Sequence, residues 1–309
     1  MSVKSSCCHE DVKTSDRTII QSAFRMAKAS KASAVLLSLD PLTEIPDESP
    51  PKGCRLIFVS QRTPEELSAV FPNGSAASVP GPVISLPKTD MTRLGQVKMG
   101  VLLALSNQLI TLGDKIVFVV GVSKENRLDS ILFLDTARES EILTSQGVGR
   151  LIEGVKPEVF EAALGIALEL GSGGREGRQV GTILVIGDEQ KVLQLSKQMI
   201  INPFKGYTDE ECNILDPKLK ETIREFAALD GAFLISGEGL VLSAGRYLGA
   251  GSGDSLVPRG LGARHIAAAG ITAMSEAVAI VVSESTGDVR IFKNGKVLME
   301  IEKPVRAHP

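Results

Sequence analysis

The stretch from Leu229 to Ala269 combines the residue types that a nucleoside triphosphate site needs. It opens with Asp230-Gly231-Ala232 and closes with Gly262-Ala263-Arg264-His265. A carboxylate can hold a divalent metal ion, glycine lets the main chain approach a ligand closely, and arginine makes paired hydrogen bonds to phosphate oxygens. The stretch therefore predicts a site for a phosphorylated ligand and a metal ion.

Two predicted helices position these residues. Asp230 follows a predicted helix over residues 218–229 and precedes a strand that begins at Phe233, so it lies at a helix-to-strand junction. Arg264 and His265 directly precede a predicted helix over residues 266–274, where free N–H groups and the helix dipole favour anions. Asp-Gly is also common in ordinary turns, so the position of Asp230 alone leaves a structural role open.

Length and composition limit the classes of protein to which the chain can belong. Its 309 residues exceed the usual size of one domain, which predicts two domains. The formal net charge of -3 and the absence of tryptophan argue against a nucleic-acid partner. No apolar run is long enough to cross a membrane and residues 1–17 are polar, so we expect a cytoplasmic protein without a membrane partner.

The first half of the chain alternates short apolar strands with helices. Strands are predicted at residues 34–37, 56–59, 83–86, 115–120 and 130–134, and helices at 18–30, from Pro64, and at 91–110. This order predicts an N-terminal three-layer α/β domain whose mostly parallel sheet is covered on both faces. It is similar to the order in the C-terminal domain of pyruvate kinase, which implies an effector-binding or assembly role. A scaffold without a ligand is the alternative.

The second half begins after residues 144–149, whose small and flexible side chains are typical of a linker. A helix is predicted at 157–170, a strand at 181–186 and a further helix from the spacing of Val192, Leu195 and Met199. The glycine-rich segment 171–178 does not match the spacing of a phosphate-binding loop and precedes its strand, which favours a simple connector. The glycine-rich loop 249–262 is long enough to favour a functional role.

Several motifs in one order make the second half resemble the diadenylate cyclase catalytic domain. Asp230-Gly231-Ala232 matches the family's Asp-Gly-Ala motif, and Gly262-Ala263-Arg264-His265-Ile266 is similar to its Gly-Thr-Arg-His-Arg motif. Segments 181–188, 202–207 and 282–287 support the match. With a pyruvate-kinase-like domain in front, the chain resembles the DacZ-type enzymes of archaea.

The resemblance and the element order together divide the chain. We expect a disordered tail at residues 1–15, a pyruvate kinase C-terminal-like domain at 16–145 and a cyclase domain at 150–305. For the cyclase domain, the resemblance implies an α/β fold with a central mixed sheet flanked by helices. The final turn of this sheet is predicted at Asn294-Gly295, a strong hairpin signal.

The resemblance also implies a reaction. The family condenses two ATP molecules into cyclic di-AMP and releases two pyrophosphates, with each 3′-hydroxyl attacking the α-phosphorus of the other nucleotide. It implies Asp230 as the catalytic residue, Mn²⁺ or Mg²⁺ held by Asp230 and Glu284, and two cyclase domains that face each other within a homodimer or a higher homo-oligomer. The implied nucleotide-binding residues are Gly231, Ala232, Leu248, Gly262, Arg264, His265 and Ser283.

Two positions depart from the family pattern. Ala263 stands where the family has threonine, and Ile266 stands where it has a second arginine, so a hydroxyl and a cation are lost. A module that senses an adenine nucleotide without turnover, with a regulatory first domain, is therefore one alternative. A purely structural assembly protein is another. The retained Asp230 and the Arg264-His265 pair favour the cyclase.

Overall fold

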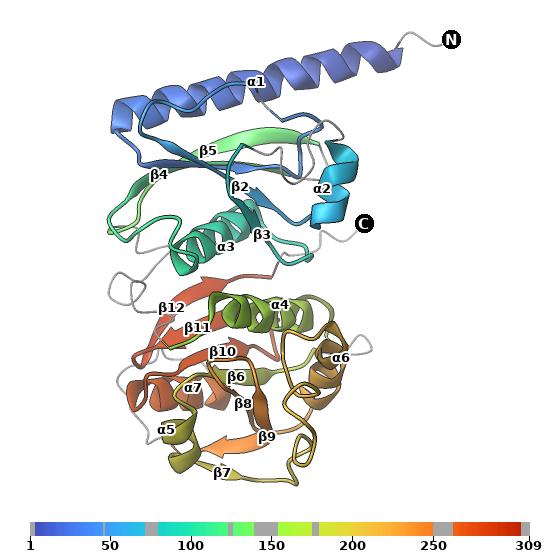
Figure 1. Ribbon diagram of the computed structural model, residues 1–309, viewed down its shortest axis with the longest axis vertical. Coiled ribbons are helices and arrows are strands. Elements are labelled where there is room, and N and C mark those ends of the chain that lie inside the picture. The colour runs from blue at the N-terminus through green and yellow to red at the C-terminus, as the bar shows by residue number, and fades with distance from the viewer. Residues whose placement is uncertain are drawn as a thin grey trace. The chain divides into compact units, whose positions relative to one another are not determined.

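The computed structural model describes residues 4–45, 47–71, 80–122, 126–138, 154–174, 179–249 and 262–303. The chain divides into two compact units, the first comprising residues 1–88 and 93–140 and the second residues 89–92 and 141–309. Each unit contains its own sheet (Figure 1). The predicted linker at 144–149 lies outside the described residues.

The first unit is built on a five-stranded sheet in the order β3-β2-β1-β4-β5. Strands β1 to β4 run parallel, and β5 pairs with β4 in the antiparallel direction. Its elements are α1 (Lys4–Ser30), β1 (Ala34–Ser38), β2 (Arg55–Ser60), α2 (Pro64–Val70), β3 (Val83–Ser85), α3 (Arg93–Ser106), β4 (Lys115–Val122) and β5 (Arg127–Asp135). The predicted mostly parallel sheet is confirmed.

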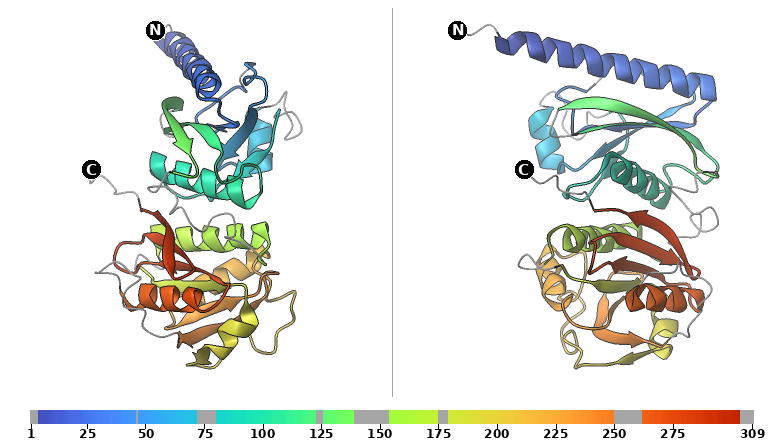
Figure 2. Two further views of the ribbon diagram at one scale, coloured as in Figure 1. Left: turned by 90° about the vertical axis from the view of Figure 1, so that its left-hand side faces the viewer. Right: turned by 180° about the vertical axis from the view of Figure 1, so that it is seen from behind.

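Helices cover both faces of this sheet. On one face, Ile20, Phe24 and Ala27 of α1 pack with Leu67 of α2 against the buried side chains of the central strands. On the other face lies α3 (Figure 2). Gly100 of this helix approaches the ring of Phe118 in β4. The predicted three layers are therefore present in this unit.

The structure differs from our expectation at the N-terminus. Helix α1 begins at Lys4, whereas we expected residues 1–15 to form a disordered tail. No glycine or proline interrupts the sequence between Lys4 and Ser30, so nothing in the backbone stops the helix from extending toward the N-terminus. Within it, Ile20, Ala23 and Ala27 are buried at helical spacing, so the C-terminal part of α1 is held by packing.

The second unit contains a seven-stranded mixed sheet in the order β12-β11-β10-β6-β8-β9-β7. Only β6 and β8 are parallel neighbours among these strands. Its elements are α4 (Pro157–Gly173), β6 (Thr182–Ile186), α5 (Glu189–Gln194), β7 (Ser196–Gln198), α6 (Pro217–Phe226), β8 (Ala232–Ile235), β9 (Val241–Leu248), α7 (Ala263–Ala273), β10 (Val278–Val282), β11 (Val289–Lys293) and β12 (Lys296–Ile301).

Helices α4 and α7 lie on opposite faces of this sheet (Figure 1). On the α7 face, Ala268 and Ile271 pack against Val185 and Ala279 of the central strands. The sequence therefore predicted the central mixed sheet and its flanking helices correctly. The hairpin turn is also confirmed, since Asn294 and Gly295 have φ values of 52° and 76° between β11 and β12.

The prediction of a helix through Val192, Leu195 and Met199 is wrong after Gln194. Helix α5 ends at Gln194, and residues 196–198 form the edge strand β7, which pairs antiparallel with β9. Val192 is buried but Met199 is 52% exposed, so the two side chains do not share one apolar face. Pairing with a distant strand has overridden the local helical spacing.

Among the helices that the structure describes, none combines the length and the apolar character needed to span a membrane.

Candidate active site

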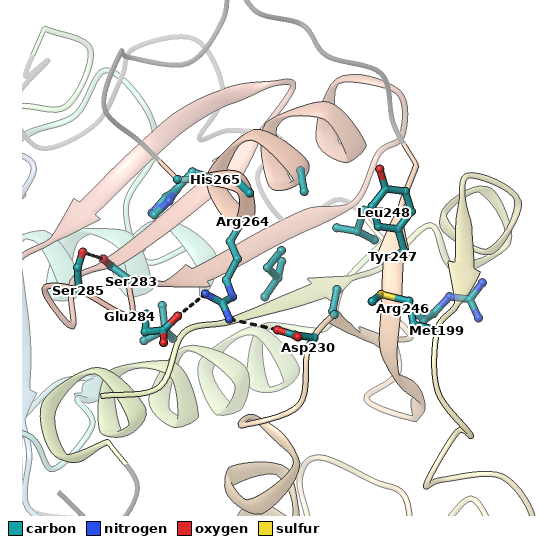
Figure 3. Close-up of a pocket in the computed structure, with 17 residues that line it drawn as sticks. Met199, Asp230, Arg246, Tyr247, Leu248, Arg264, His265, Ser283, Glu284 and Ser285 are labelled. Carbon is teal, nitrogen blue, oxygen red and sulfur yellow. Dashed lines mark hydrogen bonds and ion pairs between the residues drawn. The ribbon is translucent and has the colours of Figure 1, made fainter. Parts of the chain in front are cut away.

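The predicted site residues line one pocket of the second unit, with a volume of about 750 Å³. Figure 3 shows two ends of this pocket, with Met199, Tyr247 and Leu248 on one side and Ser283, Glu284 and Ser285 on the other. Arg264 and Asp230 lie between the two ends. The lining includes every site residue predicted from the sequence, namely Asp230, Gly231, Ala232, Leu248, Gly262, Arg264, His265, Ser283 and Glu284.

The backbone around Asp230 requires the glycine that follows it. Gly231 has a φ of +105°, and a Cβ atom there would lie 2.6 Å from the carbonyl carbon of Gly245 and 2.7 Å from the nitrogen of Arg246. The start of β8 therefore contacts the backbone of β9 directly, and only glycine fits this approach. Asp230 itself is left pointing to solvent at the pocket, with its side chain 87% exposed.

We expect Gly231→Ala to destabilise the protein, because neither backbone contact can move away cheaply and a side chain is strained at this φ. The expected loss exceeds about 1 kcal/mol, or at least about 2 °C in Tm. The matched control is Gly206→Ala, since Gly206 also has a positive φ of +99° but nothing lies within 4 Å of its Cβ position. The difference in Tm between the two variants measures the cost of the clash with the backbone of β9. Equal Tm values would contradict the close contact of Gly231 with that backbone.

Arg264 connects the two carboxylates of the pocket. Its Nη1 donates to Oε2 of Glu284 at 2.7 Å, and its Nη2 lies 3.8 Å from Oδ1 of Asp230 (Figure 3). Gly181 makes room for this pair, because a Cβ there would lie 2.9 Å from Nη1 of Arg264 and 2.8 Å from Cβ of Glu284. The guanidinium thus holds together an acidic pair that comes from two distant parts of the chain.

The acidic pair fits a divalent cation that is bound together with a phosphate. Within the described residues, no group of three or more histidine, cysteine, aspartate or glutamate side chains could hold a metal ion. Asp230 and Glu284 supply only two carboxylates, which is the donor set typical of Mg²⁺ sites completed by substrate phosphates and water. These two residues could therefore hold a metal ion when a nucleotide supplies further oxygens.

His265 lies in the first turn of α7 and is only 6% exposed. Its Nε2 lies 3.1 Å from Nη1 of Arg290, and its Nδ1 is buried with no hydrogen-bond partner among the described residues. Burial lowers the pKa of His265 below its ordinary value, and the nearby charge of Arg290 lowers it further. Both effects favour the neutral form of the imidazole.

Ser283 directly follows β10 and shapes the turn at this end of the pocket. Its hydroxyl lies 3.3 Å from that of Ser285 and accepts a 3.4 Å hydrogen bond from the N–H of Thr286. The side chain is buried, with 6% of the residue exposed. The hydroxyl groups of Ser283 and Ser285 give this end of the pocket the polar character that phosphate oxygens need.

The other end of the pocket is apolar, and sequence reasoning assigned only Leu248 there. The structure adds Met199 and Tyr247, which are 52% and 59% exposed. Tyr247 stands next to the assigned Leu248 in a segment that the sequence had already singled out, so its position was an available signal. No sequence signal pointed to Met199, because this residue reaches the pocket only through the pairing of β7 with β9.

Arg246 also lines the pocket, although it was not among the site residues predicted from the sequence. Its Nε donates to Oγ of Ser196 at 2.8 Å, and its Nη1 donates to Oε1 of Gln198 at 3.1 Å. Burial lowers the pKa of Arg246. The side chain therefore ties β7 to β9 and supports the apolar end of the pocket.

The two positions that depart from the family motif differ in location. Ala263 lines the pocket, whereas Ile266 is not among the residues that line it in the described part of the chain. Ile266 is 39% exposed on α7. Residues two apart on a helix do not face the same way, so Ile266 and Arg264 point in different directions. Residues 250–261 of the predicted glycine-rich loop lie outside the part of the chain that the structure describes.

Comparisons with known proteins match both units of the chain to family models. Residues 169–297 match the family model described as DisA bacterial checkpoint controller nucleotide-binding, and residues 15–144 match a model described as the probable sensor domain DacZ_P. A crystal structure of a DacA variant from Staphylococcus aureus aligns with a TM-score of 0.31 and 24% identity, covering 47% of this chain and 87% of that one.

Among the curated relatives named diadenylate cyclase, two match a large part of the chain. The protein of Methanocaldococcus jannaschii is 39% identical over 207 residues, which span 67% of this chain and 66% of that protein, just under two thirds of its length. The protein of Haloferax volcanii is 36% identical over 221 residues, which span 71% of this chain and 79% of that protein. From this identity and coverage, together with the matched domains, we conclude that the chain belongs to the diadenylate cyclase family.

Proposed function

We propose that the protein condenses two ATP molecules into cyclic di-AMP and releases two pyrophosphates. The observation that carries this proposal is the meeting of Asp230 and Glu284 around Arg264 in one pocket. The family relationship supplies the chemistry that such a cluster would perform. A carboxylate pair, a guanidinium and a polar end beside an apolar end fit a nucleoside triphosphate.

The two ends of the pocket support one orientation of the nucleotide. The adenosine would lie against Leu248, with Gly231 and Ala232 beside the ribose. The triphosphate would lie toward the opposite end, where Arg264 can donate to its oxygens. His265 and Ser283 would complete the phosphate contacts, and Gly262 would contribute its backbone at the start of α7.

In the reaction, the 3′-hydroxyl oxygen of one ATP forms a bond to the α-phosphorus of the other. The bond from that phosphorus to the bridging oxygen of the β-phosphate breaks, and pyrophosphate leaves. Asp230 would accept the hydroxyl proton or hold the metal ion that favours its loss. Mn²⁺ or Mg²⁺, held by Asp230 and Glu284 with phosphate oxygens, would supply Lewis-acid stabilisation of the developing charge.

We further propose that two protomers face each other during the reaction. Cyclic di-AMP contains two phosphodiester bonds made reciprocally, so each nucleotide must present its 3′-hydroxyl to the other's α-phosphorus. Asp230 lies at the open side of the pocket with its side chain 87% exposed, which suits a position facing a second site. Diluting the protein at saturating ATP should lower the rate per protomer, and a rate per protomer independent of dilution to the point of monomers would contradict this arrangement.

Incubating the purified chain with ATP and Mn²⁺ tests the proposed activity. We expect cyclic di-AMP and pyrophosphate in a ratio of one to two, identified by mass spectrometry and a pyrophosphate assay. Replacing ATP by 3′-deoxy-ATP removes the attacking oxygen and should abolish the cyclic product while leaving binding intact. Binding of ATP without any product, across both metals, would support the alternative of a nucleotide-sensing module.

Ile266 is the observation that favours this alternative, and restoring the family's arginine tests it. Because residue 266 points away from Arg264 and does not line the described pocket, we expect Ile266→Arg to change the affinity of one protomer for ATP by no more than about twofold. Titration with 3′-deoxy-ATP measures this affinity. A tenfold gain would show that the missing cation belongs to the nucleotide site, while a gain in turnover alone would place it across the facing protomers.

For the first unit, we propose a regulatory role, supported by its match to a model described as a probable sensor domain. The cytoplasmic location expected from the sequence stays a prediction.

A further inference from the structure

The hydrogen bond between Arg290 and His265 identifies the proton position on the imidazole. Arginine carries only donors, so Nη1 of Arg290 donates to Nε2 of His265 over 3.1 Å. A ring nitrogen that accepts a hydrogen bond carries no proton. In the neutral imidazole the proton must then reside on Nδ1.

Arg290 is itself held in place from two other directions. Its Nη2 donates to Oε1 of Glu300, which lies directly opposite it in the pairing of β11 with β12. The same nitrogen lies 3.7 Å from Oδ2 of Asp288, and the side chain of Arg290 is only 13% exposed. The guanidinium therefore has little freedom to turn away from His265.

The charges around His265 favour its neutral form. Burial is the largest influence that lowers its pKa, followed by Arg290, with Arg264 acting in the same direction. Glu300 and Asp288 act in the opposite direction, but both pair with Nη2 of Arg290. A doubly protonated ring would also place an N–H against the guanidinium of Arg290, where no acceptor exists.

The remaining donor of the ring has no hydrogen-bond partner among the described residues. Within the described residues, Nδ1 is buried without a partner, and His265 lines the pocket between Arg264 and the serine end. A buried N–H without an acceptor is costly, so a ligand oxygen at this position would be favoured. The ring is further confined by Phe292, whose centroid lies 6.1 Å from that of the imidazole.

We propose that Arg290 is a positioning residue that fixes His265 as the Nδ1–H tautomer and so presents a neutral donor to a phosphate oxygen of the nucleotide. This inference rests on the proposed function for the identity of the ligand. It assigns His265 to binding and excludes it as a proton acceptor at Nε2. It also gives Arg290, 26 positions beyond the Arg264 motif residue, a part in the site although it does not touch the nucleotide.

The tautomer can be measured in the full-length protein without any turnover. The chain has only three histidines, His9, His265 and His308, so the imidazole signals in long-range ¹H–¹⁵N spectra can be assigned by comparison with His265→Gln. We expect wild-type His265 to show a protonated Nδ1 and an unprotonated Nε2 at neutral pH. A predominantly Nε2–H form in the wild type would overturn the proposal.

Substitutions of Arg290 test its positioning role. Arg290→Met keeps an unbranched apolar side chain but removes the donors, so we expect the Nε2–H tautomer to appear and the affinity for 3′-deoxy-ATP to fall about tenfold. Arg290→Lys keeps a donor and should retain the wild-type tautomer and most of the affinity. The matched control is Glu300→Gln, which removes one charge beside Arg290 but leaves its donation to His265, and it should leave the tautomer unchanged.

Thermal unfolding separates a positioning role from loss of fold. If Arg290→Met is too unstable to measure, Arg290→Lys is used instead, with His265→Gln to assign the imidazole signal. An Nε2–H signal in the folded Arg290→Lys variant would contradict the proposed role of Arg290. Unchanged tautomer and affinity in folded Arg290→Met would overturn the proposal. The proposed activity fails separately, through absence of cyclic di-AMP from wild-type protein that still binds nucleotide and shows the Nδ1–H tautomer.

Discussion

Replacing Asp230 by asparagine is expected to lower the rate of cyclic di-AMP formation by at least about 100-fold, the lower range for loss of a general base. The amide keeps the size of the side chain but cannot accept the hydroxyl proton and is a weaker metal ligand. The fold should survive, because the side chain is 87% exposed and its ion pair with Arg264 spans 3.8 Å. Exposed pairs of this kind contribute at most about 1 kcal/mol.

Initial rates with ATP and Mn²⁺ measure this effect. The control is Asp209→Asn, an equally conservative change at an exposed aspartate that does not line the described pocket, and it should keep the wild-type rate. Product formation that persists unchanged in Asp230→Asn would show that another group performs the role given to Asp230. The assignment to the cyclase family would remain, since it rests on identity along the chain.

Replacing Arg264 by glutamine should weaken ATP binding by about 10- to 100-fold, because hydrogen bonds to charged groups contribute about 1.5–3 kcal/mol. The variant also removes the cation that lies between Asp230 and Glu284 in the nucleotide-free pocket. Among the described residues, the two carboxylates then have no paired cation, so we expect Mn²⁺ to bind the nucleotide-free variant more tightly than the wild type. Titration calorimetry with Mn²⁺ alone and with 3′-deoxy-ATP measures both changes.

Arg224→Gln is the matched control for this experiment. Arg224 and Arg264 have equally exposed side chains, at 33%, and each pairs with a glutamate, but Arg224 lies on α6 away from the lining of the described pocket. This control should leave both affinities at the wild-type values. Unchanged ATP affinity in Arg264→Gln would show that the guanidinium has only a structural part in holding Glu284.

The layers of both units could be predicted from the sequence because they depend on local patterns. Alternation of apolar strands with helices indicated the parallel sheet of the first unit, and Asn294-Gly295 indicated the last hairpin. The edge strand β7 could not be predicted, because it is defined by the pairing of Ser196 with Leu248, fifty-two positions away. A three-residue strand has too few residues to show a period, so the local spacing of Val192 and Met199 was misleading.

The residues of the site also divide into those that the sequence could predict and those that it could not. Asp230, Arg264 and Glu284 were found because motifs mark each of them, although their mutual distances depend on the sheet that brings them together. The partner of His265 carried no such mark. Arg290 reaches it only because the register of β11 places that side chain under the first turn of α7. Residues that position other site residues are therefore the hardest to predict from a single sequence.

A structure of the protein with Mn²⁺ and 3′-deoxy-ATP tests the central claim most directly. We expect one nucleotide in each pocket, with its phosphates contacting Arg264, His265 and Ser283 and its adenosine against Leu248. Two such pockets should face each other, with the metal ion between Asp230, Glu284 and phosphate oxygens. A nucleotide bound away from Arg264, or with its phosphates at the apolar end, would contradict the account.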